Sequence, residues 1–206
     1  MFKIDIVNLE IWENFVLGTV PFKKNAPLGP VLFPKRTVPN TKNERMRNML
    51  LENKKILIMG IRNKWSIAYG IAKAAYENGA KLIFTYTNEE NKEKTESLIS
   101  EFEGSKAYVL KDASVDELVK ETFTKIKEEN GKIDGIVHCI AHAFTEDLHN
   151  DFIKTSKDGY THAVEVSSYS FVLASRIAKE LDMINEKASL VALTYYGSTK
   201  VLEGYN

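Results

Sequence analysis

The sequence has one cysteine, no excess of either charge and no long apolar run, and each scarcity excludes a class of protein. Cys139 alone cannot form an internal disulfide, which suits a reducing compartment, so we expect a cytoplasmic protein. The 28 basic residues balance the 28 acidic ones, so no net field favours nucleic acid or an anionic membrane. No apolar run approaches the roughly 20 residues of a membrane helix, and residues 1–5 lack the pattern of a secretory signal. We therefore expect neither nucleic acid nor a membrane as a partner.

Proline is missing from residues 49–206, because all five prolines lie in the first 48 residues. Residues 23–48 are also rich in Lys and Arg. Proline at this density prevents a helix and favours extended chain. The composition predicts a flexible Pro-rich basic extension over 1–48, acting as a docking arm or only as a tail, and a folded domain over 49–206.

Strand-like and helix-like segments alternate from residue 54 onward. Short apolar runs predict strands at 56–59, 81–86, 107–110, 133–140 and 187–195. Helical periodicity predicts helices at 66–78, 88–102, 114–130 and about 160–183. Ser114 and Glu117 have the spacing of a capping box for the third helix. The alternation predicts an α/β, Rossmann-like doubly wound parallel sheet with helices on both faces.

The turn after the first predicted strand carries glycine and serine in the pattern G-x5-S-x3-G. Ligands of such sheets bind outside the carboxyl ends of the strands. Gly60 would let the backbone approach a pyrophosphate, and Ser66 would open the next helix with free amides. Gly70, on the predicted buried face of that helix, would allow close packing on the sheet. The usual G-x-G-x-x-G fingerprint is missing, so the spacing alone fits an ordinary glycine turn equally well.

Two later strand ends carry residues suited to the adenosine half of a dinucleotide. Thr87 and Asn88, followed by two glutamates, stand where a 2′-phosphate would need Arg or Lys. This favours the unphosphorylated cofactor, although acidic residues also favour the first turn of a helix by themselves. Asp112, after the third strand, is suited to accept from the adenine amino group or to cap the next helix, with Ser114 as the competing cap.

Four motifs, taken in order, resemble one family. They are Ser66-Ile67-Ala68-Tyr69-Gly70, Phe84-Thr85-Tyr86, Val166-Ser167-Ser168-Tyr169-Ser170-Phe171 and the tyrosines Tyr195 and Tyr205, which are ten residues apart. Together they resemble the NADH-dependent enoyl-acyl-carrier-protein reductases of bacterial fatty-acid biosynthesis, a branch of the short-chain dehydrogenase/reductase superfamily. The resemblance covers residues 50 to 206.

The resemblance implies a site for NADH and an enoyl substrate. The implied cofactor-binding residues are Gly60, Ser66, Ile67, Thr87, Asp112, Ala113 and Ile140. Ala143 would lie beside the acyl substrate, and Tyr195 and Tyr205 would be the catalytic pair. The family's lysine, seven residues after the second tyrosine, would fall past residue 206, so we expect the doubly wound sheet to be incomplete on its C-terminal side.

The implied reaction is hydride transfer from NADH to a trans-2-enoyl thioester on acyl carrier protein, by an enzyme that forms a homotetramer. One alternative is a 3-oxoacyl or carbonyl reductase of the same superfamily, which would carry a serine thirteen residues before the catalytic tyrosine. Ala192 occupies that position. Another alternative is an inactive nucleotide-binding fragment.

Histidine and cysteine cluster near the end of the fourth predicted strand, without the spacing of a metal site. His138, Cys139 and His142 lack the two-residue ligand spacing of zinc sites, and buried cysteine is usually a small apolar side chain. We therefore expect no metal. His162, farther along, has no partner visible in the sequence.

Overall fold

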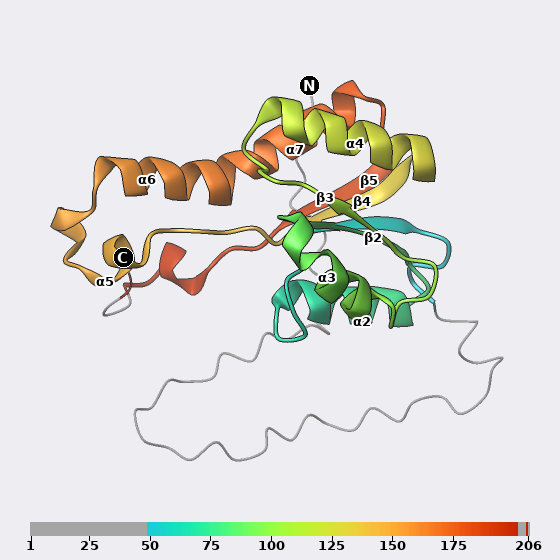
Figure 1. The fold of residues 1–206 in the computed structure, drawn as a ribbon, viewed down its shortest axis with the longest axis horizontal. Helices are drawn as coiled ribbons and strands as arrows, with labels where there is room; N and C mark the ends of the chain where they lie inside the picture. The colour runs from blue at the N-terminus through green and yellow to red at the C-terminus, as the bar shows by residue number, and fades with distance from the viewer. Residues whose placement is uncertain (1–48, 202–204, 206) are drawn as a thin grey trace, which may run out of the picture. The chain divides into compact units, whose positions relative to one another are not determined.

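A parallel sheet of five strands, in the order β3-β2-β1-β4-β5, forms the centre of the molecule (Figure 1). The computed structural model describes residues 49–201 and Tyr205. The strands are β1 (Lys55–Met59), β2 (Lys81–Tyr86), β3 (Lys106–Val109), β4 (Ile133–His138) and β5 (Ile184–Ala192). Contacts divide the chain into residues 1–46 and 47–206, and the sheet belongs to the second unit. The extension predicted over 1–48 lies outside the described residues, so its flexibility and the boundary at 49 stay predictions.

Helices cover both faces of the sheet (Figure 1), which confirms the doubly wound prediction. The covering helices are α2 (Ile67–Glu77), α3 (Lys92–Ile99, preceded by the 3₁₀ turn η2, Glu89–Asn91), α4 (Asp116–Asn130) and α7 (Ser170–Glu180). Phe123 of α4 and Leu173 of α7 pack with Leu57 of β1 on one face. Ala72 of α2 packs with Ile58 on the other face, because successive strand residues point to opposite sides. Among the described residues, no helix is both long and apolar enough to cross a membrane.

Glycines end two helices as the sequence predicts, but Gly70 does not have its predicted role. Gly79 follows α2 with φ 90° and Gly131 follows α4 with φ 70°, a region that glycine enters at little cost. Gly70 is exposed, and a Cβ built on it would meet no atom within 4 Å. The face of α2 that reaches the sheet carries Ala68, Ala72 and Ala75. The prediction for Gly70 is therefore wrong: alanine methyl groups make the close approach.

The capping box predicted at Ser114 does not form. Helix α4 begins at Asp116, and its N-cap residue, Val115, makes no side-chain cap bond. The backbone N–H of Ser114 instead donates to the Asp112 carboxylate at 2.8 Å, and its hydroxyl donates to the same oxygen at 2.7 Å. The local Asp112 turn thus takes the hydroxyl that would have capped the helix.

The long helix predicted at 160–183 is interrupted by a π-helical turn. It consists of α6 (Lys157–Val164), the π segment η4 (Glu165–Tyr169) and α7. Two short elements precede it, α5 (Thr145–His149) and the 3₁₀ turn η3 (Phe152–Lys154), which the sequence did not predict. A π turn adds a residue to a helical turn and frequently marks a functional site.

Strand β5 is displaced by three residues from the predicted strand: it covers 184–192, whereas the prediction was 187–195. The pairing of β4 with β5 shifts between Ile133 and Gly135, and Lys187 lies within the irregular stretch with φ 65°. Such a bulge leaves residues of one strand unpaired, so a regular alternation of side chains does not locate the strand. Strand β4 likewise ends at His138, before the predicted Ile140.

Candidate cofactor and substrate site

The residues predicted to bind cofactor lie after the ends of four parallel strands. Gly60 follows β1, Thr87 follows β2, Asp112 lies shortly after β3 and Ile140 follows β4. Because parallel strands end at the same side of a sheet, these residues share its carboxyl edge. The strand order reverses direction between β1 and β4, and such a switch point is where open α/β sheets bind their ligands.

Gly60 stands at this switch point, in contact with the segment that leaves β4. A Cβ built on Gly60 would lie 2.8 Å from both the Cys139 carbonyl oxygen and Cγ1 of Ile140. Its φ of 86° also disfavours any residue with a side chain. The backbone N–H of Gly60 donates to the Thr85 carbonyl at 3.2 Å, which joins the turn to β2. Glycine is thus required here by space and by conformation.

Ser66 organises the turn that leads into α2. As the N-cap residue, its hydroxyl oxygen accepts from the Tyr69 N–H at 3.3 Å and its hydroxyl donates to the Asn63 carbonyl at 2.6 Å. Ile67, the first residue of α2, remains 56 % exposed. The first backbone N–H groups of α2 therefore lie at an accessible turn, and the N-terminus of a helix this long attracts anions.

The predicted adenosine side carries polar residues at two strand ends. Thr87 is exposed, and the Asn88 side chain caps the turn η2 by accepting from the Asn91 N–H at 3.1 Å. One carboxylate oxygen of Asp112 is occupied by the bonds from Ser114. Ala113 is buried in the core, so little of its methyl group is accessible. The site thus presents hydroxyl, amide and carboxylate groups on this side.

The structure brings Tyr195 and Tyr205 together just beyond the end of β5. Their ring centroids are 4.9 Å apart at an interplanar angle of 52°, although ten residues separate them in the chain. Tyr195 is 51 % exposed and Tyr205 46 % exposed, so both phenols are accessible to a ligand. The backbone reaches this pair from the sheet, since the Leu193 N–H donates to the His138 carbonyl at 3.3 Å. The pair therefore lies at the same edge as the Gly60 turn.

His138, the last residue of β4, is buried, and Cys139, which follows it, is half-buried. The Ser170 hydroxyl donates to the Val166 carbonyl at 2.6 Å, so it accepts from Nε2 of His138 at 2.7 Å. Burial lowers the pKa of His138, which keeps the ring neutral. Burial raises the pKa of the Cys139 thiol to about 11, so thiolate is scarce at neutral pH. Among the residues described, no group of three or more His, Cys, Asp or Glu side chains is placed to hold a metal ion.

A cluster around His142, which the sequence analysis did not identify as a site, fixes the segment between β4 and α5. Nδ1 of His142 lies 2.7 Å from Nε2 of His162 on α6. The His142 backbone N–H donates to Oγ of Ser167 at 3.0 Å, and that hydroxyl donates back to the His142 carbonyl at 3.3 Å. Ala143, the predicted substrate contact, is the next residue and is half-buried. The sequence held one signal for this cluster: Ser167 and Ser170 are three residues apart, a spacing that places two side chains on the same face of a helix.

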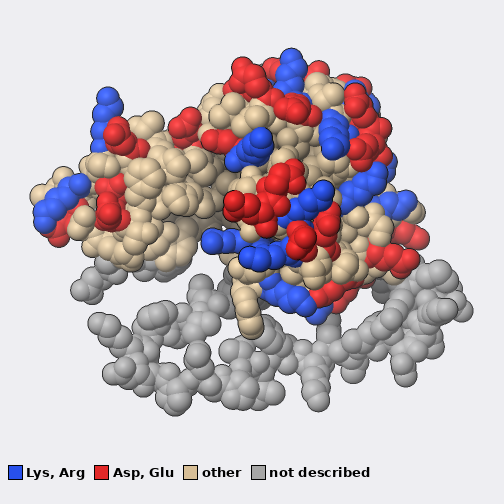
Figure 2. Space-filling model, viewed as in Figure 1, with Lys and Arg blue, Asp and Glu red and all other residues tan. Residues whose placement is uncertain are grey.

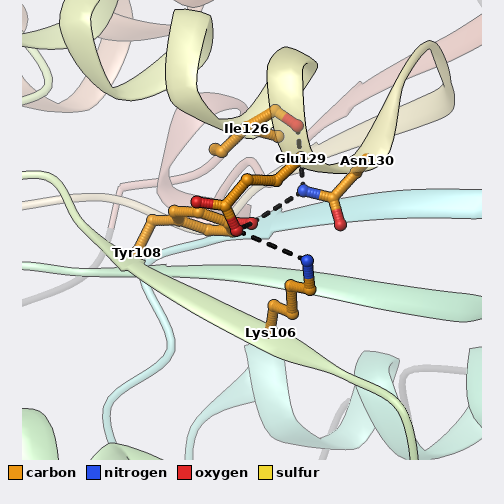
Figure 3. A network of polar contacts seen from close by, with 5 residues as sticks. All are labelled: Lys106, Tyr108, Ile126, Glu129 and Asn130. Atoms are coloured by element: carbon orange, nitrogen blue, oxygen red, sulfur yellow. Dashed lines mark hydrogen bonds and ion pairs between the residues drawn. The ribbon is translucent and has the colours of Figure 1, made fainter.

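A groove of about 660 Å³ runs along the outer edge of β3 and reaches the carboxyl ends of β2 and β3 at Tyr86 and Val109. Its floor is a polar network (Figure 3): the Tyr108 hydroxyl donates to Glu129 at 2.9 Å and accepts from the Asn130 amide at 2.7 Å. Lys106 pairs with the same Glu129 carboxylate at 3.4 Å. Lys and Glu side chains are interspersed over this face (Figure 2). Alternating charge is how proteins protect an exposed sheet edge, so we assign the groove no ligand.

The parallel sheet, its switch point and the helices on both faces define a Rossmann-like α/β domain, and the family match places it in the short-chain dehydrogenase/reductase superfamily. A family model described as "Enoyl-(Acyl carrier protein) reductase" matches residues 60–206. The chain belongs to this family of enoyl-acyl-carrier-protein reductases.

Curated and solved relatives agree with this assignment. The chain is 39 % identical over 158 residues to the NADH-dependent enoyl reductase of Bacillus cereus, covering 76 % of this chain and 61 % of the relative. It is 41 % identical over 157 residues to the NADPH-dependent enzyme of Staphylococcus aureus, covering 76 % and 60 %. The solved reductase of Anaplasma phagocytophilum in complex with NAD matches with a TM-score of 0.72 and 33 % identity, covering 77 % and 60 %. The chain thus spans about 60 % of the length of these relatives.

Proposed function

We propose that the protein is an enoyl-acyl-carrier-protein reductase, which reduces a trans-2-enoyl thioester with NADH in fatty-acid biosynthesis. The observation that carries the proposal is the pairing of Tyr195 with Tyr205 beyond β5, at the sheet edge that also holds the Gly60 turn. A phenol pair at the same sheet edge as a glycine turn suits a reaction in which negative charge develops on a substrate oxygen.

The turn after β1 fits a dinucleotide. A side chain at Gly60 would collide with Cys139 and Ile140, so only glycine lets the turn lie this close to the segment that leaves β4. The proposal places the pyrophosphate against the backbone of this turn. Ser66 and Ile67 place the amino end of α2 beside it, where a helix dipole favours phosphate. When bound, NADH supplies the hydride and the two electrons of the reduction.

The choice between NADH and NADPH rests on the end of β2. The relatives include enzymes named for each cofactor, so family membership does not decide it. Thr87 and Asn88 are uncharged, and two glutamates follow in the first turn of η2. A 2′-phosphate placed there would meet negative charge and no guanidinium, whereas a ribose hydroxyl finds acceptors. This supports NADH.

Tyr205 is assigned the catalytic hydrogen bond. Addition of hydride to the β-carbon of the enoyl thioester moves electrons to the thioester oxygen as an enolate, and protonation at the α-carbon completes the reduction. The Tyr205 hydroxyl donates a hydrogen bond to that oxygen, which is strongest when the charge has formed, and so accelerates the step. Tyr195, whose ring packs against Tyr205, orients the phenol and shapes the acyl site together with Ala143.

The sequence around β5 disfavours carbonyl reduction. A 3-oxoacyl reductase of this superfamily would carry a serine hydroxyl thirteen residues before its tyrosine, and the methyl group of Ala192 at the end of β5 cannot donate a hydrogen bond. A nucleotide-binding protein without turnover is the remaining alternative, and an assay separates it from the enzyme.

Acyl carrier protein, as carrier of the thioester, and further copies of this chain are the proposed partners, in the cytoplasm. The helix run α6–η4–α7 exposes a row of apolar side chains: Tyr160, Val164, Tyr169 and Val172. An apolar row of this length on a helical surface is suited to association with an identical helix pair. This supports a homo-oligomer, with a tetramer as the proposed state, which light scattering on the purified chain measures.

The direct test combines a binding titration with two substrates. NADH is titrated by fluorescence, and oxidation of NADH is then followed with crotonyl and acetoacetyl thioesters of acyl carrier protein. The proposal expects oxidation with the crotonyl thioester and none with the acetoacetyl thioester. Binding without turnover supports the nucleotide-binding alternative, and preference for acetoacetyl supports a carbonyl reductase.

A further inference from the structure

The segment that leaves β4 is held from two sides through a single residue, His142. Its ring meets His162 of α6 at 2.7 Å, and its backbone donor and acceptor both engage the Ser167 hydroxyl. Phe144 stacks on the His162 ring with centroids 4.6 Å apart at an interplanar angle of 13°. The segment and α6 are thus joined by hydrogen bonds and by an aromatic stack.

The π turn η4 explains how two serines reach this segment together. Ser167 lies within the turn and bonds to the His142 backbone, while Ser170 follows it and bonds to His138. The helix is therefore attached both to the end of β4 and to the loop beyond it. Figure 1 shows the chain passing from β4 to α5 below α6.

We propose that His142 and His162 form a positioning pair that fixes residues 140–143 for the acyl substrate. This inference rests on the proposed function, in which Ile140 contacts the cofactor and Ala143 the acyl group. Neither imidazole touches substrate in this account. One ring donates and the other accepts, so the pair holds the loop at a defined distance from α6. Because His142 is exposed and His162 only half-buried, the hydrogen bond has a modest effect, equivalent to about threefold to tenfold in affinity.

The disruptive variant is His162→Leu, which replaces the ring by an apolar side chain of similar size and so removes Nε2, the atom that meets His142. His162→Gln is the conservative variant, because its amide can lie near the position of Nε2. Thr161→Val is the matched control on the same helix: the Thr161 hydroxyl donates to the Lys157 carbonyl within α6. Each is compared with the wild-type chain.

The first readout is independent of catalysis. Wild type is expected to show nitrogen–nitrogen scalar coupling between the two rings by NMR, and His162→Leu to raise amide hydrogen exchange in residues 140–144 about threefold to tenfold. His162→Gln restores protection and Thr161→Val leaves it unchanged. Unchanged exchange in His162→Leu would overturn the positioning pair.

The second readout is binding of crotonyl thioester to the NAD-loaded protein, measured by calorimetry. His162→Leu weakens it about threefold to tenfold and weakens NADH binding less, because Ile140 is the one residue of the segment assigned to the cofactor and the Gly60 and Ser66 turn lies outside it. Equal loss of both affinities would indicate general destabilisation and contradict the proposal. If wild type binds NADH but no thioester, the enoyl reductase function fails, while the exchange measurement still decides whether the pair fixes the loop.

Discussion

Replacing Gly60 by alanine tests whether the turn after β1 is built around the absence of a side chain. The added Cβ would lie 2.8 Å from a backbone oxygen, Cys139 O, which cannot move cheaply. It would also hold alanine at φ 86°. The backbone conformation costs about 1–2 kcal/mol and the overpacking about 1–3 kcal/mol, so we expect a loss of about 2–5 kcal/mol in the free energy of unfolding.

Gly104 supplies a matched control for this substitution. Its φ is 77°, close to that of Gly60, but a Cβ there would meet no atom within 4 Å. Gly104→Ala therefore isolates the conformational cost of about 1–2 kcal/mol. For a domain of this size each kcal/mol lowers Tm by about 2–4 °C, so the expected falls are about 4–20 °C for Gly60→Ala and about 2–8 °C for Gly104→Ala.

Thermal unfolding with and without NADH is the assay. In Gly104→Ala, NADH at about a hundred times its Kd should still add about 2.7 kcal/mol of stability, whereas in Gly60→Ala this gain should disappear. Equal Tm losses in the two variants, with the NADH effect kept in both, would refute the reasoning from steric contact at Gly60.

Three further expectations follow from single contacts. The NADH Kd should be at least about tenfold below the NADPH Kd. Thr87→Arg should reduce this difference, because the guanidinium would bind the 2′-phosphate of NADPH. An unchanged ratio of the two Kd values would show that a residue other than Thr87 distinguishes the two cofactors. Burial raises the pKa of Tyr108 to about 12, above its usual 10, so the stability this phenol contributes is present below pH 10 and is lost as the pH rises toward 12. Tyr108→Phe should cost about 1 kcal/mol in urea unfolding at neutral pH, with a smaller difference from wild type above pH 10. Burial opposes ionisation of Asp134, but hydrogen bonds from the Lys55 N–H, Asn185 and Lys54 outweigh this effect and lower the pKa of Asp134 below 3.8. The stability that the carboxylate contributes is therefore present above pH 4 and is lost at lower pH. Asp134→Ala should lower the free energy of unfolding by about 1–3 kcal/mol at pH 7, and the variant should lose less stability than wild type on acidification.

The fold followed from the sequence because its strands are short apolar runs and its helix ends carry strong signals. Gly79 and Gly131 ended their helices where predicted, since a left-handed residue after a helix is a local requirement. The position of the candidate site at the carboxyl edge could be predicted from the same alternation of strands and helices, because a parallel sheet places the carboxyl ends of all its strands on one side. The turn position of Gly60 could be read from the sequence, but the contact with Cys139 and Ile140 that requires glycine there could not.

The predictions that failed had two causes: competition between neighbouring local patterns at Ser114, and contacts distant in sequence at the other positions. Ser114 lost its cap role to the nearby Asp112 carboxylate, and the bulge at Lys187 displaced β5 from its predicted place. Gly70 was assigned to the buried face, yet α2 is rotated so that alanines face the sheet. The contact of His142 with His162 spans twenty residues and depends on the path of α5, which the sequence did not predict.

The measurement that tests the account most directly is the rate of NADH oxidation with crotonyl acyl carrier protein, in wild type and in Tyr205→Phe. The variant removes one hydroxyl and keeps the ring that packs on Tyr195. Loss of a donor to a developing oxyanion predicts a fall in kcat of about a hundredfold to a thousandfold, with the NADH Kd unchanged. A Tyr205→Phe variant that turns over as fast as wild type would show that charge on the thioester oxygen is stabilised elsewhere, and the assignment of Tyr205 would be wrong.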